Sequence, residues 1–450
     1  MRQPSYGKLN RGLLLLLILL AFGAGFYKAV RHPLQAAFLE PPAIAAKIAS
    51  PLVDSPPGQS TRGEPASIQS RFASSRMHAQ AHAATLVELK DGRIRAFWFS
   101  GSKEGAPDVE IHSAVFDPAQ GAWGAEQKIT DRERTQHALQ RYVAKLGNPV
   151  AGRAADGSLW LYYVTVSLGG WAGSSITATR STDEGETWAA PRRIVASPFL
   201  NISTLVRNAP IQYDDGTLGF PVYHEFISKF GELLRLDLQG AILDKQRLTP
   251  GGTGALQPVL LPLNKNEATI LMRYSGPPPH RALRVTTADA GRHWTVPEKT
   301  ALPNPDSALS AIVLPDGRML AALNDIEEGR DELSLMVSAD RGQTWKTVYQ
   351  LEDQRGRPLD QTAYMGRAAR LLAMSDAKVA KAPASEQKEF QESLRQQACA
   401  PQGCRYEFSY PFLLQTRRGD FHLVYTWNRT FIKHVQFTRE WLDRQMERAK

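Results

Sequence analysis

Short apolar runs recur along the chain in pairs, and a tight polar turn joins the two members of each pair. The six pairs occupy residues 84–99, 149–164, 210–223, 258–274, 311–324 and 411–427. Asp-Gly stands at the turn in four of them, as expected where a two-residue hairpin requires a positive φ. Residues 67–350 show no sustained helical periodicity. The pattern therefore predicts six β-hairpins and excludes a helical repeat.

A second pattern, hydroxyl-x-Asp-x-Gly-x-x-Trp, is present in three copies. They are STDEGETW at 181–188, TADAGRHW at 287–294 and SADRGQTW at 338–345, and FDPAQGAW at 116–123 is a decayed fourth copy. The tryptophans are about fifty residues apart, or twice that, which is typical of propellers. Together, the hairpins and this period predict an all-β fold, a six-bladed β-propeller.

The repetition also decides what this motif does. A catalytic site is single, and the acids Glu184 and Glu186 of the first copy become Ala290 and Arg292 in the second. We therefore predict a structural motif, in which the Asp accepts hydrogen bonds from its own turn, the Gly permits the turn and the Trp packs between blades.

The N-terminal residues have a different character. Arg2, Lys8 and Arg11 precede an apolar run that begins at Leu13, so residues 1–32 are predicted to be a cytoplasmic stub and an uncleaved signal anchor, a single transmembrane helix. A cleaved signal peptide is the alternative, and the rest of the chain is exported in both cases. The predicted location is the cytoplasmic (inner) membrane, with the propeller on the periplasmic side.

The remaining boundaries follow from composition. Residues 33–66 form a Pro- and Ala-rich linker, and the propeller is expected over 67–440. A run rich in Ala, Glu, Gln and Lys predicts a helical insertion at about 355–405, before the last blade. The insertion ends at the chain's two cysteines, Cys399 and Cys404, which either form a disulfide or remain free thiols.

Charge and ligand spacing indicate which kinds of partner the protein does not bind. The formal net charge is +9, but the basic residues are scattered along the chain, so we predict no nucleic acid partner. The cysteine pair has no partner ligands at zinc spacing, and His78 and His82 are four residues apart but lack a third ligand. We therefore predict neither a metal nor a cofactor.

The innermost strands of a propeller converge on one mouth of its central channel, so the polar residues that open each hairpin should meet there. They are His82, Asn148, Asn208, Gln257, Ser307 or Ser310, and Tyr410. Hydrogen bonding to neighbouring blades is the alternative role for these side chains. His224 and Glu225, at the end of the third hairpin, are further pocket candidates.

The three octapeptides resemble the Asp-boxes of the sialidase superfamily, the BNR-repeat proteins, over roughly residues 67–440. In that family the boxes lie on the propeller face away from the active site. The resemblance implies that Tyr410 is the nucleophile and Asp108 the acid/base, with Glu104 nearby. It also implies that Arg273 and Arg330 bind the substrate carboxylate. Arg429 belongs to the segment after the last hairpin, and this segment resembles the C-terminal end that is common in BNR-repeat proteins.

Two positions depart from the family pattern. His82 stands where the family has its first arginine, and Gln257 stands where it has the glutamate that assists the tyrosine. Gln257 can orient Tyr410 but cannot take its proton, whereas His82 can. We therefore predict a pocket for an acidic sugar other than the usual sialic acid.

These observations predict a sialidase-like glycoside hydrolase acting on acidic-sugar-containing glycans outside the cytoplasmic membrane. A uronate lyase on the same propeller, with Tyr410 and His82 as its proton-transfer pair, is one alternative. A non-catalytic glycan-binding protein is the other. The predicted partners are a carboxylated glycan and, through the N-terminal helix, the membrane.

Overall fold

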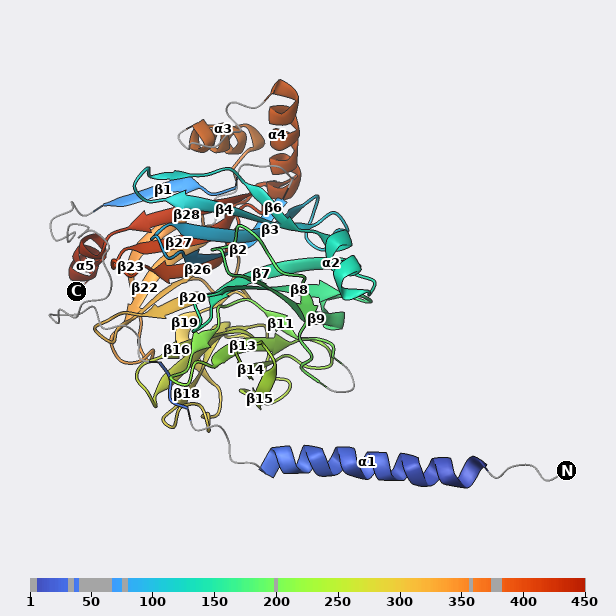
Figure 1. Ribbon diagram of the computed structural model, residues 1–450. Coiled ribbons are helices and arrows are strands. Elements are labelled where there is room, and N and C mark those ends of the chain that lie inside the picture. The colour runs from blue at the N-terminus through green and yellow to red at the C-terminus, as the bar shows by residue number, and fades with distance from the viewer. Residues whose placement is uncertain are drawn as a thin grey trace. The chain divides into compact units, whose positions relative to one another are not determined.

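The computed structural model describes residues 6–30, 36–39, 67–74, 80–197, 201–355, 359–373 and 383–449. Every predicted hairpin is present, and each lies in a separate antiparallel sheet. Six such sheets of four or five strands follow one another along the chain (Figure 1). The chain thus folds as the predicted all-β six-bladed β-propeller.

The first three blades are built in chain order. The first contains β2 (Gln80–Glu88), β3 (Ile94–Gly101), β4 (Glu110–Asp117), β5 (Ala122–Trp123) and β6 (Gln127–Thr130). The second contains β7 (Lys145–Arg153), β8 (Leu159–Val166), β9 (Ser174–Ser181) and β10 (Arg192–Arg193). The third contains β11 (Leu205–Val206), β12 (Ile211–Gln212), β13 (Leu218–His224), β14 (Phe230–Leu236) and β15 (Ile242–Arg247).

The last three blades include one strand from the other end of the chain. The fourth contains β16 (Ala255–Pro262), β17 (Ala268–Tyr274), β18 (Arg281–Thr287) and β19 (Glu298–Pro303). The fifth contains β20 (Ser310–Val313), β21 (Met319–Leu323), β22 (Glu332–Ser338) and β23 (Lys346–Asp353). The sixth contains β26 (Phe408–Gln415), β27 (Phe421–Trp427), β28 (Phe431–Phe437) and β1 (Ile68–Phe72).

The ring is closed by strands from both ends of the propeller. β1 pairs with β28, with Ile68 opposite Phe437 and Phe72 opposite Lys433. In Figure 1 β1 accordingly lies beside the red strand β28. β2 of the first blade also contacts β26 of the last. The sixth blade is therefore complete only when residues from both ends of the propeller have met.

The Asp-boxes have the structural role that their repetition predicts. In the first box, Asp183 Oδ1 accepts hydrogen bonds from Thr187 N at 2.9 Å and from Ser181 Oγ at 2.7 Å. Trp188 donates to Gly185 O at 3.0 Å and meets Phe97 of the first blade edge-on, at a centroid distance of 5.7 Å. The box therefore closes its own turn and seals the interface between two blades.

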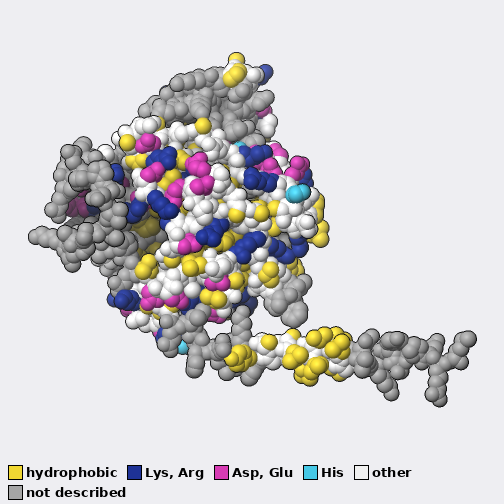
Figure 2. Space-filling model, in the orientation of Figure 1, with side chains coloured by type: hydrophobic (Ala, Val, Ile, Leu, Met, Phe, Trp, Pro, Cys, Tyr) yellow, Lys and Arg dark blue, Asp and Glu magenta, His cyan; other side chains and the backbone are white. Residues whose placement is uncertain are grey.

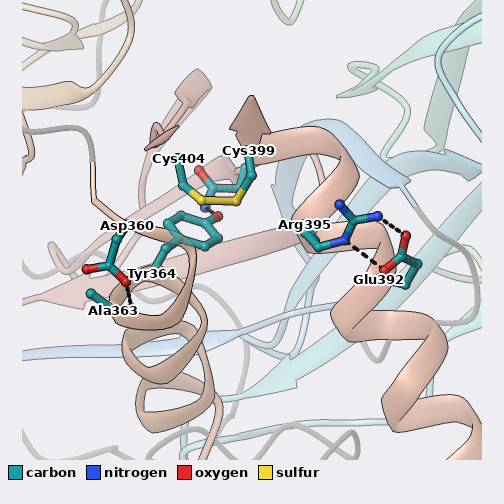
Figure 3. Close-up of a disulfide and its surroundings, with 8 residues drawn as sticks. Asp360, Ala363, Tyr364, Glu392, Arg395, Cys399 and Cys404 are labelled. Carbon is teal, nitrogen blue, oxygen red and sulfur yellow. Dashed lines mark hydrogen bonds and ion pairs between the residues drawn. A yellow bond between two sulfur atoms is a disulfide. The ribbon is translucent and has the colours of Figure 1, made fainter. Parts of the chain in front are cut away.

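The predicted helical insertion contains two helices, α3 (Gln361–Ala373) and α4 (Ala384–Ala398). A short hairpin of β24 (Cys399–Ala400) and β25 (Gly403–Cys404) follows, and a disulfide joins Cys399 to Cys404. Figure 3 shows the ring of Tyr364 from α3 beside this disulfide. Of the two states that the sequence left open for the cysteines, the structure has the disulfide.

Three helices lie outside this insertion. α2 (Arg132–Leu139) follows the first blade, and α5 (Arg439–Arg448) ends the chain with Trp441, Leu442 and Met446 buried. α1 (Tyr6–Val30) contains the N-terminal apolar run. Within the part of the chain that the structure describes, no helix meets both the length and the hydropathy needed to cross a membrane. The predicted linker, residues 33–66, lies outside the described residues except for 36–39.

Positive and negative side chains are intermixed on the visible surface of the propeller. On the face seen in Figure 2, basic side chains are interspersed with acidic ones instead of gathering in one patch. Many of these charges form ion pairs, such as Arg180 with Asp156 and Arg284 with Glu298. The net positive charge is therefore spread over this face.

One buried carboxyl in the fifth blade makes stability depend on pH. Glu332 is fully buried, and burial raises its pKa to about 7. The folded state therefore holds this proton more tightly than the unfolded state does, so the free energy of unfolding falls as pH rises from about 4.5 to 7. We expect Glu332→Gln to raise the free energy of unfolding at pH 8 by about 1–3 kcal/mol.

Urea denaturation of the variant and the unaltered protein at pH 8 and pH 4.5 measures this effect. The gain should vanish at pH 4.5, because both side chains are then neutral. The same difference at both pH values would contradict the assignment of the proton to Glu332.

Candidate active site

Four blades share an unusual backbone feature at the same end of their inner strands. The pairing register shifts between His82 and Thr85, Gly147 and Val150, Leu256 and Val259, and Ser409 and Phe412. At each shift one residue is left-handed, with φ of 56° at Ala83, 47° at Asn148, 51° at Gln257 and 53° at Tyr410. A non-glycine residue in this region costs about 1–2 kcal/mol, so its repetition marks these bulges as features that the site requires.

The bulges expose backbone carbonyls, and side chains of the third blade bind them. Asn208 Nδ2 donates to Gln257 O at 3.2 Å and to Pro258 O at 3.0 Å. Arg207 Nη2 donates to Tyr410 O at 2.7 Å and to Pro411 O at 3.0 Å. Asn208 therefore has the alternative role that the sequence left open, a hydrogen bond to a neighbouring blade.

Arg207 places a buried positive charge under Tyr410. Its guanidinium carbon lies 5.2 Å from the centroid of the Tyr410 ring, and its side chain is almost fully buried. Burial lowers the pKa of Arg207 to about 10, with Tyr410 and Tyr223 opposing the shift. Arg207 therefore remains charged at neutral pH and favours an anion above it.

Three further arginines come from the fourth, fifth and sixth blades: Arg273, Arg330 and Arg429, here called the arginine cluster. Arg273 Nε donates to Asp306 Oδ1 at 2.6 Å. Glu407 bridges the other two, accepting from Arg330 Nη1 at 3.3 Å and from Arg429 Nε at 2.9 Å.

The first blade completes these contacts. Arg429 Nη1 also donates to Glu104 Oε2 at 3.0 Å, which joins the sixth blade to the first. Arg273, Arg330 and Arg429 expose only 14%, 23% and 33% of their side chains, so the three guanidinium groups are largely shielded from water. The acids hold the guanidinium groups in fixed positions around the mouth.

His82 packs against Tyr410. The His82 and Tyr410 ring centroids are 4.4 Å apart, and neither nitrogen of His82 has a hydrogen-bonding partner among the described residues. Burial, with further contributions from Arg429, Arg330 and Arg207, holds the pKa of His82 well below its ordinary value. The imidazole is therefore neutral at physiological pH and binds a proton less readily than a free histidine.

Gln257 forms hydrogen bonds with both the third and the fourth blade. Its Nε2 donates to Tyr223 Oη at 3.4 Å, and its Oε1 accepts from Arg273 Nη1 at 3.5 Å. Glu225 follows Tyr223 by two residues, and burial raises its pKa although Arg273 opposes the shift. Glu225 is thus a carboxyl beside the arginine cluster that binds a proton more readily than a free glutamate.

The structure brings together most of the predicted site residues. Tyr410, His82, Gln257, Arg273 and Arg330 lie in this network, and Asn148 occupies the corresponding bulge of the second blade.

Two predicted residues lie outside this network of hydrogen bonds. Asp108 accepts from Ser102 N and from Ser102 Oγ, each at 2.9 Å, and no hydrogen bond or ion pair joins it to the arginine cluster among the described residues. His224 stacks on Phe230 at 4.6 Å, because alternation along the third blade turns it away from the face of Tyr223.

Sequence reasoning gave little weight to Arg429 and none to Glu407, Asp306 or Arg207. Asn428 and Arg429 are consecutive left-handed residues, with φ of 50° and 54°. Asn428 Oδ1 accepts from Glu407 N at 2.7 Å, and Asn428 Nδ2 donates to Tyr364 of the insertion. The dipeptide Asn-Arg directly after the last hairpin was the one available signal, because Asn readily adopts this conformation.

Comparisons with known proteins agree with this architecture. Residues 92–423 match a family model described as a BNR repeat-like domain. No curated protein sequence gives a match.

Several solved structures share the fold at low identity. The Hadza microbial sialidase Hz136 superposes with a TM-score of 0.58 at 16% identity, covering 82% of this chain and 68% of that one. The NanB sialidase from Streptococcus pneumoniae gives 0.57 at 10%, covering 82% and 70%. An intramolecular trans-sialidase from Ruminococcus gnavus, in complex with oseltamivir carboxylate, gives 0.56 at 12%, covering 83% and 98%. At these identities the likeness shows the fold alone.

Proposed function

Because this chain belongs to the family of BNR repeat-like domain proteins, we propose that it acts on acidic sugars of glycans as a sialidase-like glycoside hydrolase. The observation that carries the proposal is the arginine cluster beside Tyr410. Guanidinium groups match the planar geometry of a carboxylate and bind it through paired hydrogen bonds. Sialidases among its structural neighbours support the same class of substrate.

Tyr410 is the proposed nucleophile. Its oxygen attacks the anomeric carbon, the bond from that carbon to the leaving oxygen breaks, and a carboxylic acid gives its proton to the leaving oxygen. The phenol proton passes to neutral His82. Water then attacks the anomeric carbon, the bond to Tyr410 breaks, a water proton restores the carboxylic acid, and His82 returns its proton to Tyr410.

Two carboxyls are proposed for the proton donor. The sialidase resemblance implies Asp108, whereas the raised pKa of Glu225 suits a group that must be protonated before the reaction. Removing the donor should lower kcat about 10²- to 10⁴-fold on glycosides with poor leaving groups and spare those with activated ones. Comparing Asp108→Asn with Glu225→Gln on both kinds of glycoside identifies the donor. If both variants keep full activity on poor leaving groups, neither residue is the donor.

A uronate lyase is the second candidate function, and His82 favours it. The His82 imidazole lies against Tyr410, and these two side chains are the proposed proton-transfer pair of the β-elimination. One group removes the proton at C5 of the uronate, the bond from C4 to the glycosidic oxygen breaks, and the other group protonates that oxygen. A carbon–carbon double bond remains in the product.

Incubating the full-length protein with sialosides and with polygalacturonate tests both functions. A hydrolase releases reducing sugar without new ultraviolet absorbance, and a lyase releases an unsaturated product that absorbs in the ultraviolet. Binding of N-acetylneuraminate or galacturonate without any product would refute catalysis and leave a glycan-binding protein. Neither binding nor product would refute the proposed function as a whole.

We also propose that residues 1–32 anchor the protein in the cytoplasmic membrane, with the propeller outside. The basic residues before the apolar run support this orientation. The disulfide between Cys399 and Cys404 suits an oxidising compartment. Protease added to intact spheroplasts should degrade the propeller, and its full protection there would contradict the proposal.

A further inference from the structure

The insertion is fixed to the propeller at several points. Tyr364 of α3 is fully buried and accepts a hydrogen bond from Asn428 Nδ2. Leu394 of α4 is buried in the core of the fifth and sixth blades. The disulfide closes the segment after α4 (Figure 3), and Leu359 and Cys404 exchange two backbone hydrogen bonds. α4 is therefore held in place as a wall.

A cleft of about 750 Å³ lies between this wall and the first blade. Gln80, Ser102 and Lys103 line it from the blade, and Ser385, Lys388 and Gln396 are among the residues that line it from α4. Intervals of three and eight residues place the three α4 residues on one helix face, whereas Leu394 lies on the buried face. All residues that line the cleft are polar, so it suits a ligand that forms hydrogen bonds.

The charge of this cleft is positive. Lys103 and Lys388 line it, and neither forms an ion pair within the described part of the chain. Glu392 also lines it, but Arg395 Nε donates to Glu392 Oε2 at 2.9 Å and Gln396 Nε2 donates to Glu392 Oε1 at 2.9 Å. The one acid is thus engaged with its own helix, and two lysine charges remain for a ligand.

The cleft and the arginine cluster share one loop. Lys103 lines the cleft, and the next residue, Glu104, forms the ion pair with Arg429 at 3.0 Å. Glu104 N also donates to Gln80 Oε1 at 2.9 Å, so Gln80, which lines the cleft from the first blade, holds this loop in place. Consecutive Cα atoms are about 3.8 Å apart, so the cleft and the arginine cluster are bordered by neighbouring residues of this loop.

We propose that this cleft is a second anion subsite, which holds the carboxylate of a neighbouring sugar while the arginine cluster holds the first. The inference rests on the proposed function, because it extends the same site along the glycan. It specifies the substrate class as a polyanionic glycan in which adjacent sugars both carry carboxylates. A single acidic sugar at the end of a neutral chain would leave both lysines without a partner.

Binding of monomers and trimers to the full-length protein tests the subsite. The probes are N-acetylneuraminate and its α-2,8-linked trimer, and galacturonate and its α-1,4-linked trimer. We expect the double variant Lys103→Gln, Lys388→Gln to bind the preferred trimer about 3- to 10-fold more weakly and its monomer unchanged, since both lysines are exposed and ion pairs of exposed groups are weak. Lys265→Gln, an exposed lysine beside the Asp-box turn of the fourth blade, is the matched control and should change neither affinity.

The outcomes separate this inference from the proposed function. If the unaltered protein binds a monomer but its trimer no more tightly, the subsite is refuted and the proposed function stands. If the double variant loses monomer and trimer affinity equally, the lysines act on the first site and the subsite is again refuted. If no monomer or trimer binds, both proposals fail.

Discussion

Tyr410→Phe is expected to lower kcat on the substrate that the activity panel identifies by about 10³-fold or more, and to leave substrate affinity within about threefold. The phenol oxygen is the only atom lost. Phe keeps the ring that packs 4.4 Å from His82 and 5.2 Å from the Arg207 guanidinium. The backbone carbonyl of residue 410 can still accept its hydrogen bond from Arg207. Steady-state kinetics together with equilibrium titration of the substrate separate kcat from affinity.

A buried tyrosine that takes no part in the reaction provides the control. Tyr162 is fully buried in the second blade, and its hydroxyl has no hydrogen-bonding partner among the described residues. Tyr162→Phe should therefore change neither kcat nor affinity. Unchanged turnover of Tyr410→Phe would remove the tyrosine from both the hydrolase and the lyase mechanisms.

Arg429→Gln is expected to weaken the binding of an acidic monosaccharide by about 10- to 100-fold, because a hydrogen bond to a charged group contributes about 1.5–3 kcal/mol. The loss has a second cause. Glu104 and Glu407 each lose their bond to Arg429, and Glu104 then faces the site as an unpaired negative charge. Isothermal titration with N-acetylneuraminate or galacturonate measures the change.

A double-mutant cycle separates the two causes. If the unpaired carboxylate contributes, adding Glu104→Gln to Arg429→Gln should restore part of the affinity. Arg284→Gln removes an arginine that pairs with Glu298 in the fourth blade and should leave binding unchanged. Full affinity in Arg429→Gln would show that the sixth blade does not contribute to the anion site.

The fold could be predicted from the sequence because its signals are local. An Asp-Gly turn between two apolar runs specifies a hairpin, and the Asp183 carboxylate binds groups within four residues of itself. Such short-range patterns can be recognised in the sequence because they do not depend on contacts with the neighbouring blades. The apolar N-terminal run likewise predicts a helix, and α1 forms there.

The site could be predicted only where a family motif marks it. Tyr410, Arg273 and Arg330 occupy positions that the sialidase resemblance assigns, and the structure places them in one network. Arg429 acquires its role through Glu104, which is 325 residues away in the chain. No periodicity or spacing in a single sequence reports such a contact between the first and last blades.

The direction in which a side chain points could not be predicted from the sequence either. Asp108 has the residue type and the loop expected of an acid/base, but Ser102 occupies both of its carboxylate oxygens. Asn208 is turned toward the bulge of the next blade and binds two of its carbonyls. In both cases hydrogen bonds that leave no pattern in the sequence decide where the side chain points. Those of Asp108 are local, and those of Asn208 reach the next blade.

The seam between the sixth and first blades has a consequence for biosynthesis. β1 is the first strand of the propeller to leave the ribosome, but its partner β28 follows more than 350 residues later, and the bond between Glu104 and Arg429 crosses the same seam. Contacts so distant in sequence form slowly, and none of these can form before synthesis of the last blade. A nascent or truncated chain therefore lacks part of the anion site, and we expect full binding only after the ring has closed.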